Sequence, residues 1–204
     1  MRIKVLIIVT AGLLLSINLW AAMPILKGVG GDFSLQSSLG RQVSLTDFRG
    51  KVVLMFFGYT NCADICPTTM AHMSQLMERL QPADRARVQV LFVSIDSDND
   101  TAAHLNNYLT YFDSSFIGLV DTPAKVDAVA NQYHAEYVKL ADNIVTTVYK
   151  KLTLADEDKE QKGYLFSHTA KIYVMDIKGR VRGYFYMGTP HADMQSQIEQ
   201  LLQE

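Results

Sequence analysis

The chain has 204 residues, 20% of them charged, and a formal net charge of −2 at pH 7. A charge so close to balance implies neither a nucleic acid nor an anionic membrane surface as a partner. The two cysteines cannot form the disulfide framework of a small secreted domain. The residues that follow the N-terminal apolar segment are enough for one domain with a core of its own.

The N-terminus carries a membrane-targeting segment. Arg2 and Lys4 precede residues 5–26, which contain no charged side chain. This stretch fits a signal peptide, and it is also long enough to span a bilayer, which needs about 20 residues. We expect residues 1–26 to be a signal peptide or an N-terminal membrane anchor, and residues 27–204 to form the domain. The basic residues before the apolar run predict a periplasm-facing domain, either anchored in the inner membrane or secreted after cleavage.

Apolar patterns predict strands that alternate with helices through the first two thirds of the chain. The expected elements are a β-hairpin of 32–35 and 42–45, a buried strand 51–59, a helix that starts at Pro67, a buried strand 88–95, a helix 101–112, a strand 116–120 and a helix 123–133. Met70, Met73 and Met77 share one face of the first helix and are expected in the core.

The last third of the chain adds a second hairpin and a final helix. The expected elements are a strand-like region 134–151 with β-branched residues at 145–149, a charged loop 156–163, a hairpin of 169–176 and 181–187, and an amphipathic helix 192–204. The sequence therefore predicts an α/β fold: a central mixed β-sheet flanked by helices, with an N-terminal β-hairpin and a C-terminal helix.

Cys62 and Cys66 lie between the buried strand 51–59 and the helix predicted from Pro67. The free N–H groups and the dipole of a helix N-terminus stabilise a thiolate there. Sites in α/β folds form at the carboxyl ends of the strands, where these thiols are expected. A buried structural pair is the simplest alternative, because free cysteine often packs as a small apolar residue. Polar Asp64 between the two thiols favours a functional pair.

Two functional classes compete for these thiols: a dithiol that exchanges electrons with other proteins, and a site for a soft metal ion. Redox motifs of the thioredoxin type have two residues between the cysteines, whereas three stand between Cys62 and Cys66. Two thiolates are an incomplete ligand set for Cu(I), so a metal site needs a third ligand from elsewhere in the fold.

Histidine is the natural third ligand, and the chain has five. His72 and His104 fall on predicted helix faces, away from the strand ends, and are expected to be structural. His134 and His191 lie in connections and are weak candidates. His168 immediately precedes the first strand of the C-terminal hairpin, and its imidazole could reach the sulfurs if that strand neighbours strand 51–59. Spacing alone leaves an ordinary strand-end histidine equally open.

A run of acidic residues offers a second candidate site. Asp96, Asp98 and Asp100 match the start of a calcium-binding loop. However, Thr101 stands where that loop needs glycine, and Asn107 stands where it needs a bidentate glutamate. We interpret this segment as a polar loop.

Six short motifs follow one another in a fixed order. They are Gly31-Asp32-Phe33, Asp47-Phe48-Arg49-Gly50-Lys51-Val52-Val53-Leu54, Phe57-Gly58-Tyr59-Thr60-x-Cys62-x-Asp64-x-Cys66-Pro67-Thr68-Thr69, Val93-Ser94-x-Asp96, Phe116-Ile117-Gly118-Leu119 and His168-Thr169-Ala170. From about residue 31 to residue 186 the chain resembles the Sco (SenC) copper-binding proteins, which have a thioredoxin-like fold.

The resemblance implies a function as well as a fold. By it, Cys62, Cys66 and His168 would bind one copper ion per chain. The protein would be a metallochaperone rather than a turnover enzyme, and would deliver copper to, or keep reduced the cysteines of, the copper site of cytochrome c oxidase or a similar cuproprotein. A thiol reductase and another copper chaperone are further expected partners.

The chain departs from the family pattern close to these ligands. Asn61, Ala63 and Ser167 stand where members commonly carry histidine or a similar residue, proline and aspartate, respectively. The position before the histidine matters because neighbouring groups orient ligand histidines. The alternative function uses no stable metal: a thiol:disulfide oxidoreductase in which Cys62 attacks and Cys66 resolves.

Overall fold

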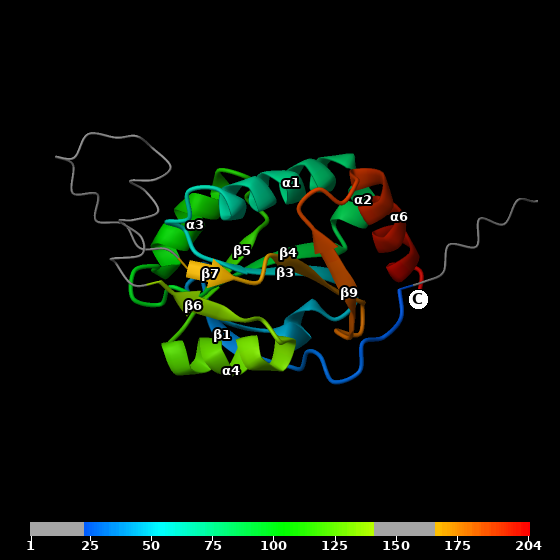
Figure 1. Ribbon diagram of the computed structural model, residues 1–204. Helices are drawn as coiled ribbons and strands as arrows, with labels where there is room; N and C mark the ends of the chain where they lie inside the picture. Colours follow the sequence, from blue (N-terminus) through cyan, green and yellow to red (C-terminus); the bar gives the residue numbers. More distant parts are fainter. Residues whose placement is uncertain (1–22, 141–165) are drawn as a thin grey trace, which may run out of the picture.

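The computed structural model describes residues 23–140 and 166–204. Within them, seven strands form one sheet in the order β2-β1-β5-β4-β3-β8-β9 (Figure 1). These strands are β1 (Ser34–Ser37), β2 (Gln42–Ser44), β3 (Val52–Gly58), β4 (Val88–Ser94), β5 (Ile117–Val120), β8 (Lys171–Met175) and β9 (Val181–Tyr186). The helices are the 3₁₀-helix η1 (Leu45–Phe48), α1 (Ile65–Arg79), α2 (Pro82–Arg85), α3 (Ala102–Thr110), α4 (Pro123–Tyr133) and α6 (His191–Leu201).

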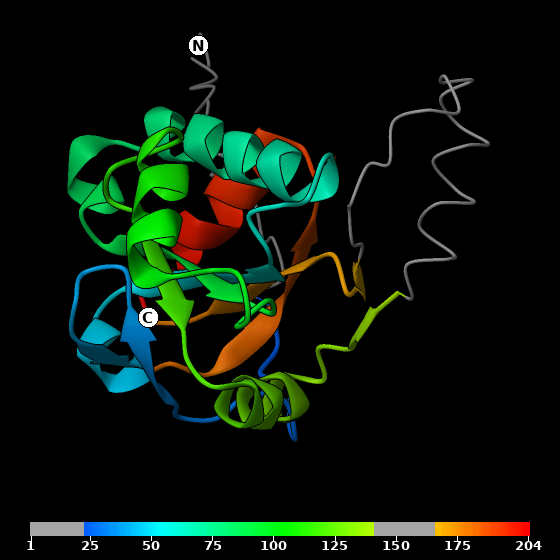
Figure 2. The same cartoon turned by 90° about the vertical axis from the view of Figure 1, so that its left-hand side faces the viewer.

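The sheet is mixed and is covered on both faces, as the sequence predicts. β3, β4 and β5 run parallel, while the two hairpins, β1–β2 and β8–β9, are antiparallel and form its edges. Helices α1, α3 and α6 lie on one side of the sheet, and α4 lies on the other (Figures 1 and 2). The predicted fold class and both hairpins are confirmed.

The two central strands decide where a site can form. Every residue of β3 and of β4 is buried. A strand that is covered on both faces is mostly apolar along its whole length, which explains the apolar runs of β3 and β4; the buried Gln89 of β4 is satisfied by hydrogen bonds to two carbonyl oxygens. The two strands pair in register from Val52 with Val88 to Gly58 with Ser94, so their carboxyl ends meet at one edge of the sheet.

The helix that follows β3 begins earlier than the sequence predicts. α1 starts at Ile65, so Cys66 lies inside its first turn and Pro67 is its third residue. Proline fits there because the first N–H groups of a helix have no partner within the helix. Met70, Met73 and Met77 are buried, which confirms their place in the core.

The residues before the second hairpin form a separate small sheet. β6 (Tyr137–Lys139) pairs antiparallel with β7 (Phe166–His168). Three predicted features lie wholly or mostly outside the described residues: the strand-like stretch 145–149, the charged loop 156–163 and the targeting segment 1–26. Over residues 23–140 and 166–204, no helix combines the length and apolar character needed to cross a membrane.

The end of the sheet opposite to Gly58 carries a buried ionic cluster. The guanidinium of Arg182, 6% exposed, pairs with Asp176, 0% exposed, and with Glu204. Arg180 also contacts Asp176, at 2.6 Å. Arg182 donates a further hydrogen bond of 2.7 Å to the carbonyl oxygen of Met23. We call this cluster, together with residues 23–26 that dock against β9, the far end.

Candidate metal centre

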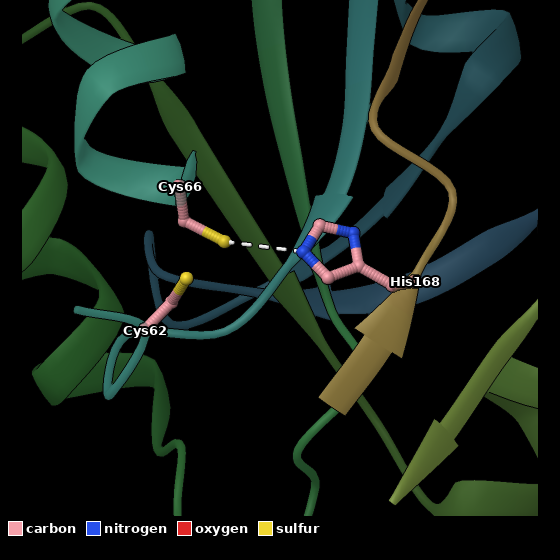
Figure 3. A group of neighbouring side chains, drawn as sticks. All are labelled: Cys62, Cys66 and His168. Carbon is pink, nitrogen blue, oxygen red and sulfur yellow. Dashed lines mark hydrogen bonds between the residues drawn. The ribbon is translucent and has the colours of Figure 1, made fainter. Parts of the chain in front are cut away.

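The thiols lie at the carboxyl edge of the sheet, where the chain leaves β3 and enters α1. The loop is turned by a hydrogen bond from the Cys62 N–H to the Tyr59 carbonyl oxygen, at 3.4 Å. Cys62 is half-buried in this loop, and Cys66 is buried in the first turn of α1. Both are free thiols, and their side chains approach each other (Figure 3). The location predicted from the strand-to-helix pattern agrees with the structure.

His168 reaches the thiols from β7. Its Nε2 lies 3.6 Å from the Cys66 sulfur, although 102 residues separate them in sequence (Figure 3). β8, which starts three residues later, pairs antiparallel with β3 and brings His168 to this edge. His168 itself belongs to the small β6–β7 sheet, where it pairs with Tyr137, rather than to the central sheet.

The three side chains could hold a metal ion. The sulfurs of Cys62 and Cys66 and a ring nitrogen of His168 all lie within 4.8 Å of one another. In the described part of the chain, no other group of three or more His, Cys, Asp or Glu side chains meets this condition. Two thiolates and an imidazole are soft and intermediate ligands, which suit Cu(I) and Zn(II) far better than Ca²⁺ or Mg²⁺.

The two sulfurs differ in protonation. A hydrogen bond with Cys66 is the main cause that lowers the pKa of Cys62; burial opposes it, and His168 and backbone N–H groups lower it further. The same hydrogen bond, followed by burial, raises the pKa of Cys66. The two pKa values are therefore shifted in opposite directions, and the more exposed Cys62 is the sulfur that loses its proton more readily.

The imidazole of His168 is oriented without an aspartate at position 167, where this chain has serine. Its Nδ1 lies 3.4 Å from the carbonyl oxygen of Thr169, which leaves Nε2 directed at the sulfurs. The rings of Phe56 and Tyr59 pack edge-on against it, with centroids 5.7 and 6.2 Å away. Ser167 is exposed and is not needed for this orientation. A backbone carbonyl is a common partner of the second nitrogen of a ligand histidine.

Two residues that the sequence did not single out shape the site. A Cβ atom on Gly58 would lie 2.9 Å from the Cys66 sulfur and closer still to the Phe56 ring, so only glycine leaves room there. Tyr59 accepts a hydrogen bond of 3.3 Å from the Phe166 N–H, which joins the cysteine loop to β7. Their only sequence signal is their place in the Phe57-Gly58-Tyr59-Thr60 motif.

The other histidines do not join the thiols. His72 stacks on His191, with ring centroids 4.1 Å apart, and His134 ends α4 in a left-handed conformation. His104 was expected away from the strand ends, and that expectation is wrong: its Nδ1 lies 3.5 Å from the Thr60 hydroxyl, just beyond β3. The N-terminus of α3 is brought to the same edge because β4 and β3 are neighbours.

The acidic segment is a hydrogen-bonded loop, as interpreted from the sequence. Asp100 is buried and accepts hydrogen bonds from Ser94 and Thr60, whereas Asp98 is exposed. Nearby, the Tyr108 hydroxyl is buried without a hydrogen-bond partner in the described residues. Burial and the charges of Cys66, Cys62 and Asp100 raise the pKa of Tyr108.

Comparison with known proteins identifies the family. The family model described as SCO1/SenC matches residues 23–203. The chain belongs to the SCO1/SenC family. A SCO2-like protein of Rickettsia felis is 27% identical over 161 residues, which cover 78% of this chain and 70% of that protein. The human protein named Protein SCO1 homolog, mitochondrial, is 30% identical over 77% of this chain, which spans 47% of the human protein.

Solved structures agree with this assignment. The structure described as Bradyrhizobium japonicum ScoI with copper bound is similar to this chain, with a TM-score of 0.70 and 29% identity. The match covers 85% of this chain and 99% of that one. The expected resemblance to the Sco family and its thioredoxin-like fold are thereby confirmed.

Proposed function

We propose that this protein binds one copper ion through Cys62, Cys66 and His168 and passes it to a partner cuproprotein. The observation that carries the proposal is the convergence of the three ligand atoms within 4.8 Å. The B. japonicum relative, whose structure has copper bound, supports copper as the metal. Copper is then cargo rather than a permanent part of the protein.

The geometry suits a metal that has to leave again. Cys66 is buried in the first turn of α1, whereas Cys62 is half-exposed in the loop before it. An incoming thiolate of a partner would reach the metal on the Cys62 side and could replace Cys62 before the buried ligand. Three ligands also leave coordination positions open for such an exchange.

The proposed target is the copper site of cytochrome c oxidase or a similar cuproprotein, as the family resemblance implies. The protein would load that site with copper or keep its cysteines reduced. We further propose a periplasm-facing domain, anchored or released according to the fate of residues 1–26. A thiol reductase would keep Cys62 and Cys66 reduced in that oxidising compartment, and another copper chaperone would supply the metal.

Titration of the reduced protein with Cu(I), in competition with a chromophoric chelator, tests the ligand set. We expect one tightly bound ion per chain, and a loss of affinity of about 10-fold or more in His168→Ala because a ligand is removed. His134→Ala is the matched control, since His134 lies at the end of α4. Tight stoichiometric binding that is unaffected by His168→Ala would rule out the three-ligand site.

The approach of two free thiols, of which Cys62 is half-exposed and has a lowered pKa, supports a second candidate function, thiol:disulfide exchange. The Cys62 thiolate would attack a partner disulfide, release one partner thiolate and form a mixed disulfide. Cys66, after losing its proton, would attack the Cys62 sulfur and release the second partner thiolate. Two electrons pass to the partner, and Cys62–Cys66 is left as a disulfide.

Stopped-flow reduction of a model disulfide separates the two functions. If copper binds weakly while the disulfide is reduced rapidly by the wild type, and only to the mixed-disulfide stage by Cys66→Ser, the oxidoreductase is supported. Tight Cu(I) binding with slow reduction supports the metallochaperone.

A further inference from the structure

We infer that Asp100 is a positioning residue of the metal centre: its buried carboxylate fixes Thr60 and thereby the loop that carries Cys62. The inference rests on the proposed function for its relevance to copper, but the contacts themselves are independent of any metal. The sequence places this side chain only in an incomplete calcium-loop pattern, which we interpret as a polar loop, and gives it no role toward the thiols.

The carboxylate joins three segments at the edge of the sheet. Its Oδ2 accepts a hydrogen bond of 2.6 Å from the Ser94 hydroxyl, at the end of β4. The same oxygen accepts the Thr60 backbone N–H at 3.2 Å, and Oδ1 accepts the Thr60 hydroxyl. Asp100 itself precedes α3. One side chain thus connects the ends of β3 and β4 and the start of α3.

The position of Thr60 controls the position of Cys62. Thr60 lies two residues before Cys62, in the turn closed by the hydrogen bond between Tyr59 and Cys62. Thr60 is held through both its backbone and its side chain, so the turn cannot rotate without breaking contacts to a buried carboxylate. Such breakage is costly, because an unpaired buried charge is strongly disfavoured.

The charge of Asp100 has a consequence beyond positioning. Its side chain is 1% exposed, and its only ion-pair partner among the described residues is His104, at 3.7 Å. The hydrogen bonds that hold it come from neutral donors, so its negative charge is not cancelled locally. A buried negative charge held against Thr60, two residues before Cys62, favours a divalent ion over a monovalent one, because the attraction scales with the charge of the ion.

Four variants separate positioning from charge. Asp100→Ala removes the hydrogen bonds and the charge, whereas Asp100→Asn retains a similar shape and removes the charge. Thr60→Val removes the donor hydroxyl, and Thr60→Ser restores it. Asp98→Asn is the matched control, because Asp98 is exposed in the same loop and the change in net charge is equal.

Two measurements are made on each variant. Hydrogen exchange of the Thr60 amide, followed by NMR in the reduced, metal-free protein, reports the position of the loop. Competition titrations report the affinities for Cu(I) and, with immediate spectroscopic readout, for Cu(II). Metal-free exchange keeps this inference testable even if wild-type protein fails to bind copper, which would overturn the proposed function alone.

We expect Asp100→Ala to lose Thr60 protection and to bind both copper ions about 10-fold or more weakly, as for other groups that orient metal ligands. We expect Thr60→Val to lose part of the Thr60 protection and part of the copper affinity, and Thr60→Ser to keep both at the wild-type level. Asp100→Asn keeps most protection but lowers Cu(II) affinity more than Cu(I) affinity, a change of ratio that a purely structural role would not produce.

Unchanged Thr60 exchange and unchanged copper affinities in Asp100→Ala would overturn the inference. The same holds if Asp98→Asn alters the Cu(II) to Cu(I) ratio as much as Asp100→Asn does. If Asp100→Ala does not fold, Thr60→Val and Asp100→Asn decide the question with the same two measurements.

Discussion

The two ends of the central sheet use buried polar groups in different ways. At the far end, Arg182 is surrounded by the carboxylates of Asp176 and Glu204, so each charge has an opposite partner. At the thiol end, the Asp100 carboxylate is held by hydrogen bonds from Ser94 and Thr60, and its one ion-pair partner among the described residues is the exposed His104. Opposite charges are paired at the far end, whereas the buried carboxylate at the thiol end is held mainly by uncharged donors.

This difference separates stability from binding. Removing one partner of a buried ion pair strongly destabilises the fold, because the other charge remains buried alone. Unbalanced negative charge at the thiol end contributes less to the fold but attracts a cation. Changes at the far end should therefore alter the free energy of unfolding, whereas changes at the thiol end should alter metal affinity.

The largest expected effect is that of Arg182→Ala. Removal of this guanidinium takes from buried Asp176 its more deeply buried cationic partner, although Arg180 remains, and also takes the partner of Glu204. We expect a loss of about 3 kcal/mol in the free energy of unfolding, at the lower end of the range for a broken buried pair. Urea denaturation measures it, and Cu(I) affinity should stay within experimental error of the wild type. Arg180→Ala is the control, since Arg180 is 38% exposed and should lose much less. A large fall in Cu(I) affinity would show that the two ends are coupled.

The next effect is that of Gly58→Ala. The new methyl group would lie 2.9 Å from the Cys66 sulfur, and overpacking of this kind costs about 1–3 kcal/mol. We also expect weaker Cu(I) binding because Cys66 must move. Gly118→Ala is a matched control: its methyl group would lie 2.8 Å from Leu105, away from the thiols. Equal losses of affinity in both variants would show that the effect of Gly58→Ala does not depend on its contact with Cys66.

Low pH should reduce the stability of the protein through protonation of Asp176 at the far end. Burial opposes ionisation there, but hydrogen bonds from Arg180, Lys178 and Arg182 outweigh it and lower the pKa of Asp176. Its contribution to stability is therefore present above the unfolded pKa of about 3.9 and is lost as the pH falls through the lower, folded value. We expect the stability of Asp176→Asn to fall less steeply below about pH 4 than that of the wild type. Thermal unfolding between pH 6 and about 2.5 measures both slopes, and parallel curves would contradict the assignment.

The smallest expected effect is that of Ser167→Asp, which introduces the residue common in the family. His168 already has Thr169 and two aromatic rings to orient it, so Cu(I) affinity should change by less than about threefold, well below the usual effect of an orienting group. The competition titration used for His168→Ala measures it. A gain of 10-fold or more would show that the carbonyl contact is a poor substitute.

Local patterns predicted most of the fold. Mostly apolar runs predicted β3 and β4, because strands covered on both faces have few polar positions. Turn residues gave both hairpins, and Pro123 marked the start of α4. The start of α1 was misplaced because proline is accepted at more than one position of a first helical turn.

The site could be predicted only in part. The thiols of Cys62 and Cys66 follow from one strand-to-helix junction, so their proximity is local. The ring of His168 comes from 102 residues away and from a different sheet, and spacing could not decide its role; the family resemblance did. The contacts of Asp100 and Arg182 were not predicted, because burial of a charged side chain depends on tertiary contacts that no local pattern records.

The docking of Met23 against β9 has a practical meaning for how the domain is presented. The Leu26 N–H donates a hydrogen bond to the Val181 carbonyl oxygen, and Arg182 donates one to the Met23 carbonyl oxygen. The first described residues therefore lie at the end of the sheet opposite the thiols. If the domain were attached to a surface by a flexible linker before Met23, its thiols would face away from that surface. For immobilisation on a sensor chip, an N-terminal linker would therefore leave Cys62 facing the solution, where a partner can approach it.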